Sequence, residues 1–154
     1  MNYTYSHRKA TLADLQEIIK LYHEDELGQT REKISENISP KYIKAFELIN
    51  TDPNQYLMVI ESNNKIIGTC HLTIMPSLTF EGSTRLQIEA VRVLEGFRSK
   101  KVGEWMINTA IQYGNEHNAK IIQLTTNKKR DSAIRFYEKL GFQSTHEGMK
   151  LYIK

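Results

Sequence analysis

One strand of this sequence shows a change of phase at a place where a backbone amide could do chemistry. Apolar and polar residues alternate over 86–90, but Val91 and Val93 are apolar too, so the inward parity changes after Ala90. An inserted bulge residue produces such a slip. A bulge leaves an amide without its ladder partner, and that amide can donate to a substrate carbonyl. A bulge that only bends the strand is the alternative interpretation.

The residues after this strand predict a site for a phosphorylated ligand. Arg98, Lys100 and Lys101 lie before a helix predicted from Val102 onwards. The inward stripe of that helix is Val102, Trp105, Met106, Thr109, Ala110 and Tyr113. The first amides of a helix have no intrahelical acceptor and lie at the positive end of its dipole, where anions bind. A solvated helix start is the alternative.

A second strand, loop and helix follow in the same order. Residues 120–126 are apolar and β-branched, which predicts a central strand, and the loop 127–130 (Asn-Lys-Lys-Arg) ends it. A helix is predicted from Asp131 to Leu140, with Gly141 at its left-handed cap. Two cationic loops at the carboxyl ends of neighbouring strands lie where open α/β sheets bind ligands.

These segments together resemble the GCN5-related N-acetyltransferase (GNAT) family. The resemblance rests on residues 89–93, the loop 98–103 and the run from Asn127 to Phe142, in the correct order and at the correct separation. It is strong over 83–142 and weaker before Met75, where only the order of elements agrees. It implies an α/β (α+β) fold with a mixed, mostly antiparallel central sheet of six to seven strands and helices on both faces. The sheet would be splayed between strands 4 and 5, with acetyl-CoA in the gap.

The resemblance also implies which residues bind the cofactor. The bulge lines the pantetheine arm, the loop wraps the pyrophosphate, and the asparagine and the following helix lie near the thioester. The implied residues are Val91, Arg92, Val93, Arg98, Ser99, Lys100, Lys101, Val102, Gly103, Glu104, Asn127, Arg130, Ser132, Ala133, Phe136 and Tyr137. Ser99 and Lys101 stand where the family usually has glycine, and a left-handed backbone there strains a side chain. We expect cofactor binding to be retained despite this strain.

Acetyl transfer from a thioester to an amine needs a base for the ammonium, a donor for the oxyanion and an acid for the thiolate. The Val91 amide is the predicted oxyanion donor. The resemblance implies Tyr137 as the acid, since a phenol and a thiol have comparable pKa values. Glu89 is the predicted base, acting through a water, because it should face the cleft. A structural ion pair at Glu89 is the alternative, and His146 is the second candidate base.

The first half of the chain is expected to select the acceptor. Thr11 and Asp14 resemble a capping box, and Ser39-Pro40 starts a second helix that reaches Ile49. The stretch between these helices is acidic, with Glu24, Asp25, Glu26, Glu32 and Glu36. Such charge favours a small cationic molecule or a basic peptide end as the acceptor, and a solvated acidic loop is the alternative.

The following residues predict a hairpin and an exposed loop. Residues 55–61 and 65–75 are joined at Asn63-Asn64, which is typical of a tight turn between strands. The loop 76–83 carries Leu78 and Phe80, which we expect to be exposed. They would cap the acceptor site or contact a second subunit in a homodimer.

Length and composition are those of one acetyltransferase domain over residues 1–154. There is no signal peptide and no apolar run long enough for a membrane span, so we expect a cytoplasmic protein. One cysteine excludes an internal disulfide, and Cys70 and His71 would point to opposite faces of a strand. The five histidines show no metal-ligand spacing, so no metal is expected. A net charge of +3 is explained by the two cationic loops, so nucleic-acid binding is not inferred.

Two functions of different classes remain open. The first is an enzyme that moves an acetyl group from acetyl-CoA directly to a primary amine. The second is a non-catalytic CoA-binding sensor or regulator on the same fold, which the altered glycines favour. The presence of Glu89 and Tyr137 favours the enzyme, because a sensor needs neither an acid nor a base. A helix-turn-helix regulator is disfavoured, because the acidic stretch between the first two helices would repel DNA.

Overall fold

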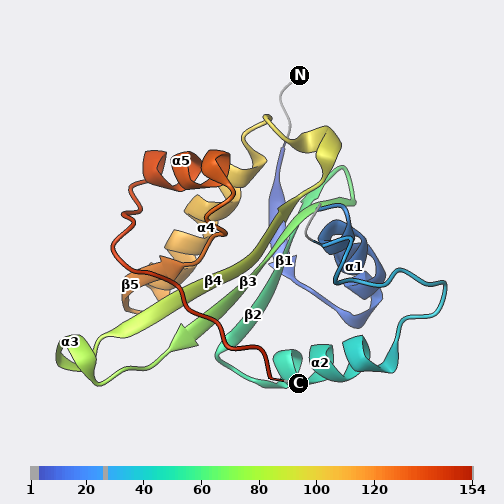
Figure 1. The fold of residues 1–154 in the computed structure, drawn as a ribbon. Helices are drawn as coiled ribbons and strands as arrows, with labels where there is room; N and C mark the ends of the chain where they lie inside the picture. Colours follow the sequence, from blue (N-terminus) through green and yellow to red (C-terminus); the bar gives the residue numbers. More distant parts are fainter. Residues whose placement is uncertain (1–3, 26–27, 154) are drawn as a thin grey trace.

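The computed structural model describes residues 4–25 and 28–153, whose strands form a five-stranded sheet in the order β1-β2-β3-β4-β5 (Figure 1). The strands are β1 (Ser6–Lys9), β2 (Gln55–Ser62), β3 (Lys65–Met75), β4 (Thr84–Val93) and β5 (Ala119–Leu124). β4 and β5 pair in parallel, and the other neighbouring strands are antiparallel. The predicted mixed, mostly antiparallel sheet is therefore confirmed.

Helices cover both faces of this sheet (Figure 1). On one face lie α1 (Leu15–His23) and α2 (Pro40–Thr51). On the other lies α4 (Val102–Glu116), with α5 (Asp131–Lys139) next to its first turn. A short turn, α3 (Thr79–Gly82), closes the connection between β3 and β4. None of the helices that the structure describes is long and apolar enough to cross a membrane.

The sheet separates two apolar cores because alternate residues of a strand point to opposite faces. In β2, Met58 and Ile60 belong to the core under α4, whereas Leu57 and Val59 belong to the core under α1 and α2. The α4-side core also contains Cys70, Leu72, Leu86, Ile88, Val102, Met106, Ile107 and Ala110. The opposite core is completed by Leu15, Ile18, Ile19 and Phe46.

Local sequence signals explain several boundaries. Asn63 and Asn64 both have positive φ, 51° and 60°, as a two-residue type I′ hairpin requires. Pro40 occupies the first turn of α2, and the Ser39 hydroxyl accepts a hydrogen bond from the Lys41 amide. The predicted hairpin and second helix are therefore confirmed.

An ion-pair cluster fixes the start of α1 to the sheet. Asp14 accepts hydrogen bonds from the Thr11 amide (2.7 Å) and from the Arg8 guanidinium (2.6 Å), and Arg8 also bonds Glu61 on β2 (2.8 Å). The Arg8 hydrogen bond is the main reason that the pKa of Asp14 falls from 3.8 to about 2. The predicted capping box is thus part of a larger contact between β1, β2 and the helix start.

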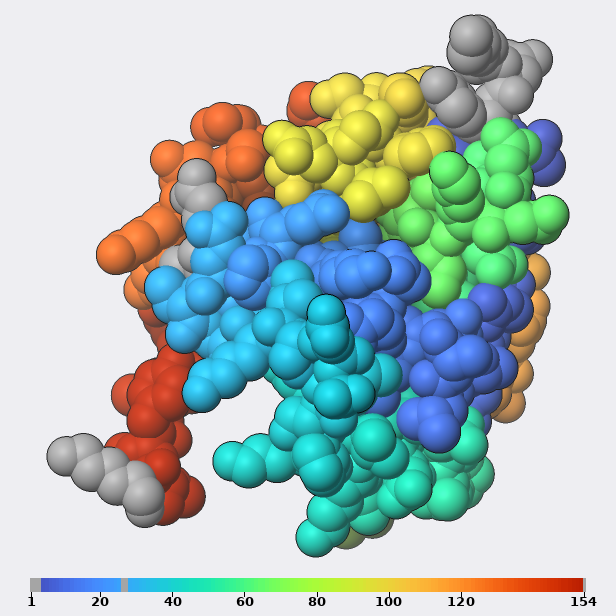
Figure 2. Space-filling model, turned by 90° about the vertical axis from the view of Figure 1, so that its right-hand side faces the viewer, coloured from blue at the N-terminus to red at the C-terminus, as the bar shows by residue number. Residues whose placement is uncertain are grey.

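The number of strands corrects the prediction of six to seven, because the described residues form five. Further strands would have to come from the segment after α5, but residues 143–153 form no ladder. Residues 143–148 are polar and bring no apolar face to the sheet, so little burial is gained to offset the entropy of ordering them. Met149 and Leu151 are 93% and 90% exposed, and the red end of the chain stands apart from α2 (Figure 2). β5 is therefore an edge strand.

Candidate active site

The predicted bulge in β4 is confirmed by the pairing of β3 with β4. Thr69 pairs with Arg92 and His71 pairs with Glu89, so the single residue Cys70 faces both Ala90 and Val91. Ala90 has φ 51°, a left-handed conformation that costs a non-glycine residue about 1 kcal/mol or more. The bulge also changes which face each side chain occupies.

The two faces of the bulged strand carry different chemistry. Val91 and Val93 pack against the α4-side core, as Leu86 and Ile88 do. Glu89 and Arg92 stand opposite His71 and Thr69, which are two residues apart on β3 and so share a face. Without the extra residue, positions 89 and 92 would lie on opposite faces. Glu89, His71 and Arg92 therefore belong to the face that α1 partly covers.

The pairing of β4 with β5 ends well before β4 does. The last pair is Ile88 with Leu124, and β4 continues through residues 89–93. Phe136 and Tyr137 of α5 pack against the α4-side core near this end of the sheet. The backbone of the bulge consequently lies beyond the β4–β5 ladder.

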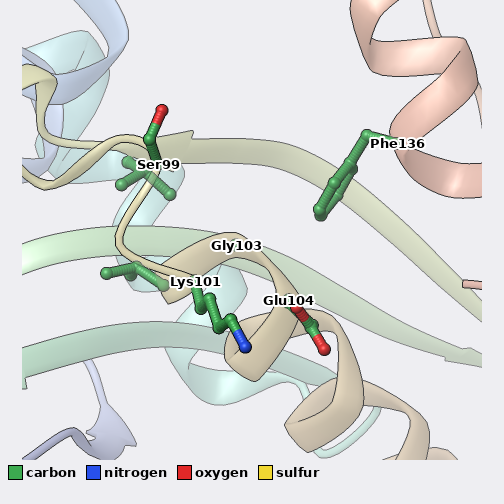
Figure 3. Close-up of a pocket in the computed structure, with 7 residues that line it drawn as sticks. Ser99, Lys101, Gly103, Glu104 and Phe136 are labelled. Atoms are coloured by element: carbon green, nitrogen blue, oxygen red, sulfur yellow. The ribbon is translucent and has the colours of Figure 1, made fainter. Parts of the chain in front are cut away.

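A cavity of about 380 Å³ lies at the carboxyl end of β4, between the following loop, the first turn of α4 and α5 (Figure 3). Seven residues line it, and all seven are among those that the sequence assigned to the cofactor. They are Val93, Ser99, Lys101, Val102, Gly103, Glu104 and Phe136. The structure therefore brings together residues from β4, α4 and α5 that are up to 43 positions apart, since 136 − 93 = 43.

The loop before α4 adopts the strained backbone expected from its missing glycines. Ser99 and Lys101 both have φ 62°, in the left-handed region. Lys101 is the N-cap residue of α4, and the helix begins at Val102. Each left-handed side-chain residue costs about 1–2 kcal/mol relative to an ordinary conformation. The loop therefore keeps its shape at the expense of stability, with the first amides of α4 at the cavity.

Gly103 is required by the close approach of α5 to α4. Figure 3 shows Phe136 reaching from α5 towards the start of α4, near Gly103. A Cβ atom on Gly103 would lie 3.3 Å from the Phe136 ring, which is tighter than ordinary contact. The third glycine position of the loop thus has a packing reason to remain glycine.

Several residues assigned to the cofactor lie outside this cavity. The Arg98 Nε donates to the Val93 carbonyl (3.4 Å), and the Lys100 ammonium lies 4.8 Å from the centre of the Phe97 ring. The Asn127 side chain accepts a hydrogen bond from the Lys129 amide (2.9 Å), which closes its own turn. Ser132 and Ala133 belong to the first turn of α5, and Ser132 is exposed. None of these residues lines the cavity.

Tyr137, the candidate acid, is half-buried, and its ring contacts the rings of Phe136 and Phe142. Its ring centre lies 5.1 Å from that of Phe136 and 5.8 Å from that of Phe142. Burial raises the pKa of the Tyr137 phenol, Cys70 adds to this effect, and Arg92 and Arg130 oppose it. The phenol is therefore protonated at neutral pH and able to donate.

Glu89, the candidate base, is exposed and stands opposite His71 on β3. Burial lowers the pKa of His71, although the nearby Glu89 charge acts in the opposite direction. The His71 Nε2 is buried and has no hydrogen-bond partner among the described residues. His146, the second candidate base, is exposed on the segment after α5 and bonds the Thr145 hydroxyl (2.7 Å).

The sequence alone gives no chemical partner for His71, because alternation along the strand separates it from Cys70. Alternation does place Cys70 in the α4-side core, where burial raises the pKa of its thiol, and His71 on the other face. The pairing of His71 with Glu89 depends on the strand register. The sequence does contain one indication of this position. His71 alternates with Thr69 and Thr73, and a histidine between two threonines predicts the polar face of the strand.

A second group that the sequence did not predict joins three distant elements. The carboxylate of Asp25, which follows α1, accepts a hydrogen bond from Arg130 at the start of α5. The same carboxylate oxygen lies 3.6 Å from a nitrogen of Arg92 on β4. Burial alone would raise the pKa of Asp25, but the Arg130 hydrogen bond and the charges of both arginines lower it. No local signal pairs these positions.

No group of three or more potential metal ligands of the His, Cys, Asp and Glu types comes together within residues 4–25 and 28–153. Around the bulge the described residues bring together amide, carboxylate, imidazole, phenol and guanidinium groups. These are the groups that positioning and proton transfer use.

Comparison with known proteins finds similar solved structures and similar curated acetyltransferases. A crystal structure of a transcriptional regulator from Bacillus halodurans C-125 is 37% identical, covers 97% of this chain and 100% of its own, and has a TM-score of 0.95. An uncharacterized N-acetyltransferase of Methanocaldococcus jannaschii is 25% identical over 140 residues, which are 91% of this chain. An aminoalkylphosphonate N-acetyltransferase of Salmonella typhimurium is 27% identical over 95 residues, which are 62% of this chain.

The match to these two curated relatives spans only 61% of the length of each. The family model described as the acetyltransferase (GNAT) family, however, matches residues 13–142, from the start of the first helix region to the end of the α5 cap. That range includes the bulge, the strained loop, the cavity and Tyr137. On this match, the chain belongs to the GNAT family of acetyltransferases.

Proposed function

We propose that this protein is an N-acetyltransferase, built as one domain, that moves an acetyl group from acetyl-CoA directly to a primary amine. The observation that carries the proposal is the cavity at the end of β4, lined entirely by residues that the sequence had assigned to the cofactor. Membership of the GNAT family supports the same reaction class.

The cavity fits the phosphate-bearing part of acetyl-CoA. The start of α4, with its first amides and the positive end of its dipole, lies at this cavity, and Lys101 is one of the residues that line it. The pantetheine arm would then follow residues 91–93, where β4 runs beyond its ladder with β5. Acetyl-CoA supplies the thioester, and the protein supplies the backbone donors and charges that hold it. A splay between β4 and β5 is part of this proposal.

Three groups near the bulge take the chemical roles. The Val91 amide stabilises the developing oxyanion, because a fixed backbone dipole needs no reorientation during the reaction. Tyr137 protonates the leaving thiolate, and its raised pKa keeps the phenol protonated at neutral pH until that thiolate forms. Glu89 accepts the ammonium proton through a water, with His71 opposite it on the same face. The ammonium loses one proton to Glu89 through the water, and the amine nitrogen forms a C–N bond to the acetyl carbon as the C–S bond breaks. The sulfur takes the Tyr137 proton, and the second proton that the nitrogen releases restores the phenol.

The acceptor is proposed as a primary amine of a small molecule or peptide. A cationic acceptor was expected from the acidic stretch after α1, but two of its carboxylates have partners. Asp25 is paired with two arginines, and Glu32 accepts a hydrogen bond from the Tyr42 hydroxyl (2.5 Å). Among the relatives, the Salmonella protein is named for acetylation of aminoalkylphosphonates, which are amines.

A homodimer is proposed for the assembly. Leu78 and Phe80 are 96% and 69% exposed at the tip between β3 and β4, and β5 is an edge strand. Exposed apolar side chains beside a sheet edge are typical of surfaces that a second copy covers. Light scattering during size-exclusion chromatography gives the mass, and the mass of one chain would contradict this assembly.

The decisive experiment measures free-thiol release from acetyl-CoA over a panel of primary amines. We expect amine-dependent release, and a loss of rate in Glu89→Gln that is greater than in His146→Gln. A larger loss in His146→Gln would assign the base to His146 instead. Amine-independent binding of acetyl-CoA with no release by any amine would contradict the transferase.

The second candidate is a CoA-binding regulator without turnover. Two observations favour it: the most strained positions of the loop are Ser99 and Lys101, and the Bacillus halodurans structure is that of a transcriptional regulator. In this case acetyl-CoA binds, measured by calorimetry, and the thiol-release assay stays at background for every amine. The same pair of measurements therefore separates the two candidates.

A further inference from the structure

Among the residues that the structure describes, two arginines share one carboxylate beside the bulge, so their positive charges exceed its negative charge by one. Arg92 and Arg130 both contact the Asp25 carboxylate. Their side chains are only 22% and 33% exposed, and that of Asp25 is 16% exposed. Because the two arginines lower the pKa of Asp25, this carboxyl is ionised at neutral pH. The group therefore carries a net charge of about +1 in a partly desolvated position, where unpaired charge is unfavourable.

Arg92 retains unused hydrogen-bonding capacity. One of its terminal nitrogens donates to the Val91 carbonyl (2.7 Å), and the other lies 3.6 Å from Asp25. Its Nε is buried without a partner among the residues that the structure describes. Guanidinium groups present several donors in a plane and bind carboxylates and phosphates through pairs of them. The arrangement thus has both the charge and the donors for a second anion.

The position of this group separates it from the cofactor cavity. Neither Arg92 nor Arg130 lines that cavity, although the sequence assigned both to the cofactor. The bulge places Arg92 on the face of Glu89, while Val91 and Val93 face α4. Both arginines also act on the pKa of Tyr137, so they lie within electrostatic reach of its phenol. Figure 2 faces the side of the molecule that carries α1 and shows, in light blue, the segment that follows this helix.

We propose that Arg92 and Arg130 bind an acidic group of the acceptor, so that the acceptor is a primary amine that also carries a carboxylate or a phosphate. This inference rests on the proposed acetyl transfer, and it names the substrate class for it. Because the bulge counts as one strand step, Glu89 and Arg92 are separated by about 7 Å along β4. An amine that faces Glu89 and an acid that faces the arginines would therefore belong to a short molecule.

The test compares four amines that differ in the group at their other end. They are propylamine, β-alanine, phosphoethanolamine and 1,3-diaminopropane, measured for kcat/KM with acetyl-CoA by thiol release. We expect an acidic amine to exceed propylamine by about tenfold or more, since a charged hydrogen bond contributes about 1.5–3 kcal/mol. Arg130→Gln and Arg92→Gln should reduce this preference by about tenfold, and Arg130→Lys should restore part of it.

Arg135→Gln is the matched control, because it removes one exposed positive charge from the same helix without touching Asp25. It should leave the preference unchanged. Thermal unfolding of each variant shows whether it folds, and the wild-type panel decides the question without any variant. A preference for propylamine or 1,3-diaminopropane in the wild type overturns the proposal. So does a raised KM for acetyl-CoA with unchanged acceptor preference, which would assign the arginines to the cofactor phosphates.

Calorimetry separates failure of this inference from failure of the transferase. Phosphoethanolamine and propylamine are titrated into the protein in the presence of CoA. Tighter binding of phosphoethanolamine, lost in Arg130→Gln and kept in Arg135→Gln, supports the anion site even if no amine releases thiol. Equal binding of the two probes overturns the anion site, whatever the thiol-release assay gives.

Discussion

The strained N-cap of α4 makes a sharp prediction, because glycine and alanine at Lys101 differ mainly in backbone strain. Both substitutions remove the ammonium group, but only glycine relieves the left-handed φ of 62°. The relief amounts to about 1–2 kcal/mol for a residue with a side chain. Glycine also has more conformational entropy in the unfolded chain, which lowers the free energy of unfolding of the glycine variant by about 0.5–1 kcal/mol. We therefore expect Lys101→Gly to be more stable than Lys101→Ala by about 0.5–1 kcal/mol.

Thermal unfolding followed by circular dichroism measures this difference. For a domain of this size, 1 kcal/mol shifts the Tm by about 2–4 °C, so Lys101→Gly should melt about 1–4 °C above Lys101→Ala. Lys100 provides the control, because this residue is not among those with positive φ. There the order should reverse, with Lys100→Ala more stable than Lys100→Gly. If the alanine variant is the more stable one at both positions, the strain argument is refuted.

Three further predictions concern other parts of the molecule. Tyr137→Phe should lower kcat by about 10²-fold or more while the Kd for acetyl-CoA changes little, because the phenol acts only as thiolate is released; stopped-flow and calorimetry check the two quantities. Asp14→Asn should lose about 2 kcal/mol of stability at pH 7, because the folded pKa of Asp14 is depressed from 3.8 to about 2. The stabilisation is present above pH 3.8 and is lost as the pH falls towards 2, so denaturant curves of wild type and variant should converge there. Gly68→Ala should lower the stability of the fold by about 1–3 kcal/mol, because the new Cβ would lie 3.0 Å from the Arg92 carbonyl oxygen. Denaturant unfolding measures this change, and a Cm within error of that of the wild type would contradict it.

The features that could be predicted from the sequence are those set by neighbouring residues. The bulge follows from the phase change at Ala90 and the hairpin from Asn63-Asn64, whereas the strained loop was expected from the family resemblance, which places glycine at two of its positions. The bulge and the hairpin each depend on a few consecutive residues, whose backbone preferences act wherever the segment lies. The capping box was found for the same reason, but its Arg8 and Glu61 partners were not.

The features that sequence reasoning missed depend on register and on distance along the chain. Asp25 and Arg130 are 105 residues apart, and their contact requires the loop after α1 to meet the start of α5. The pairing of His71 with Glu89 requires the β3–β4 register, which is itself set by the bulge. The extra strands were expected from the family resemblance alone, and the polar residues 143–148 do not supply them.

The bulge in β4 connects the two proposed halves of the reaction. A regular strand would alternate from Glu89 to Arg92, so that these two side chains would face opposite sides of the sheet. The extra residue returns Arg92 to the face of Glu89 and leaves Val91 and Val93 on the α4 side. Cofactor contacts on one side and acceptor contacts on the other then come from a single stretch of five residues, 89–93. The left-handed Ala90 is the conformational cost of this arrangement, and any substitution that straightens β4 should disturb both binding events together.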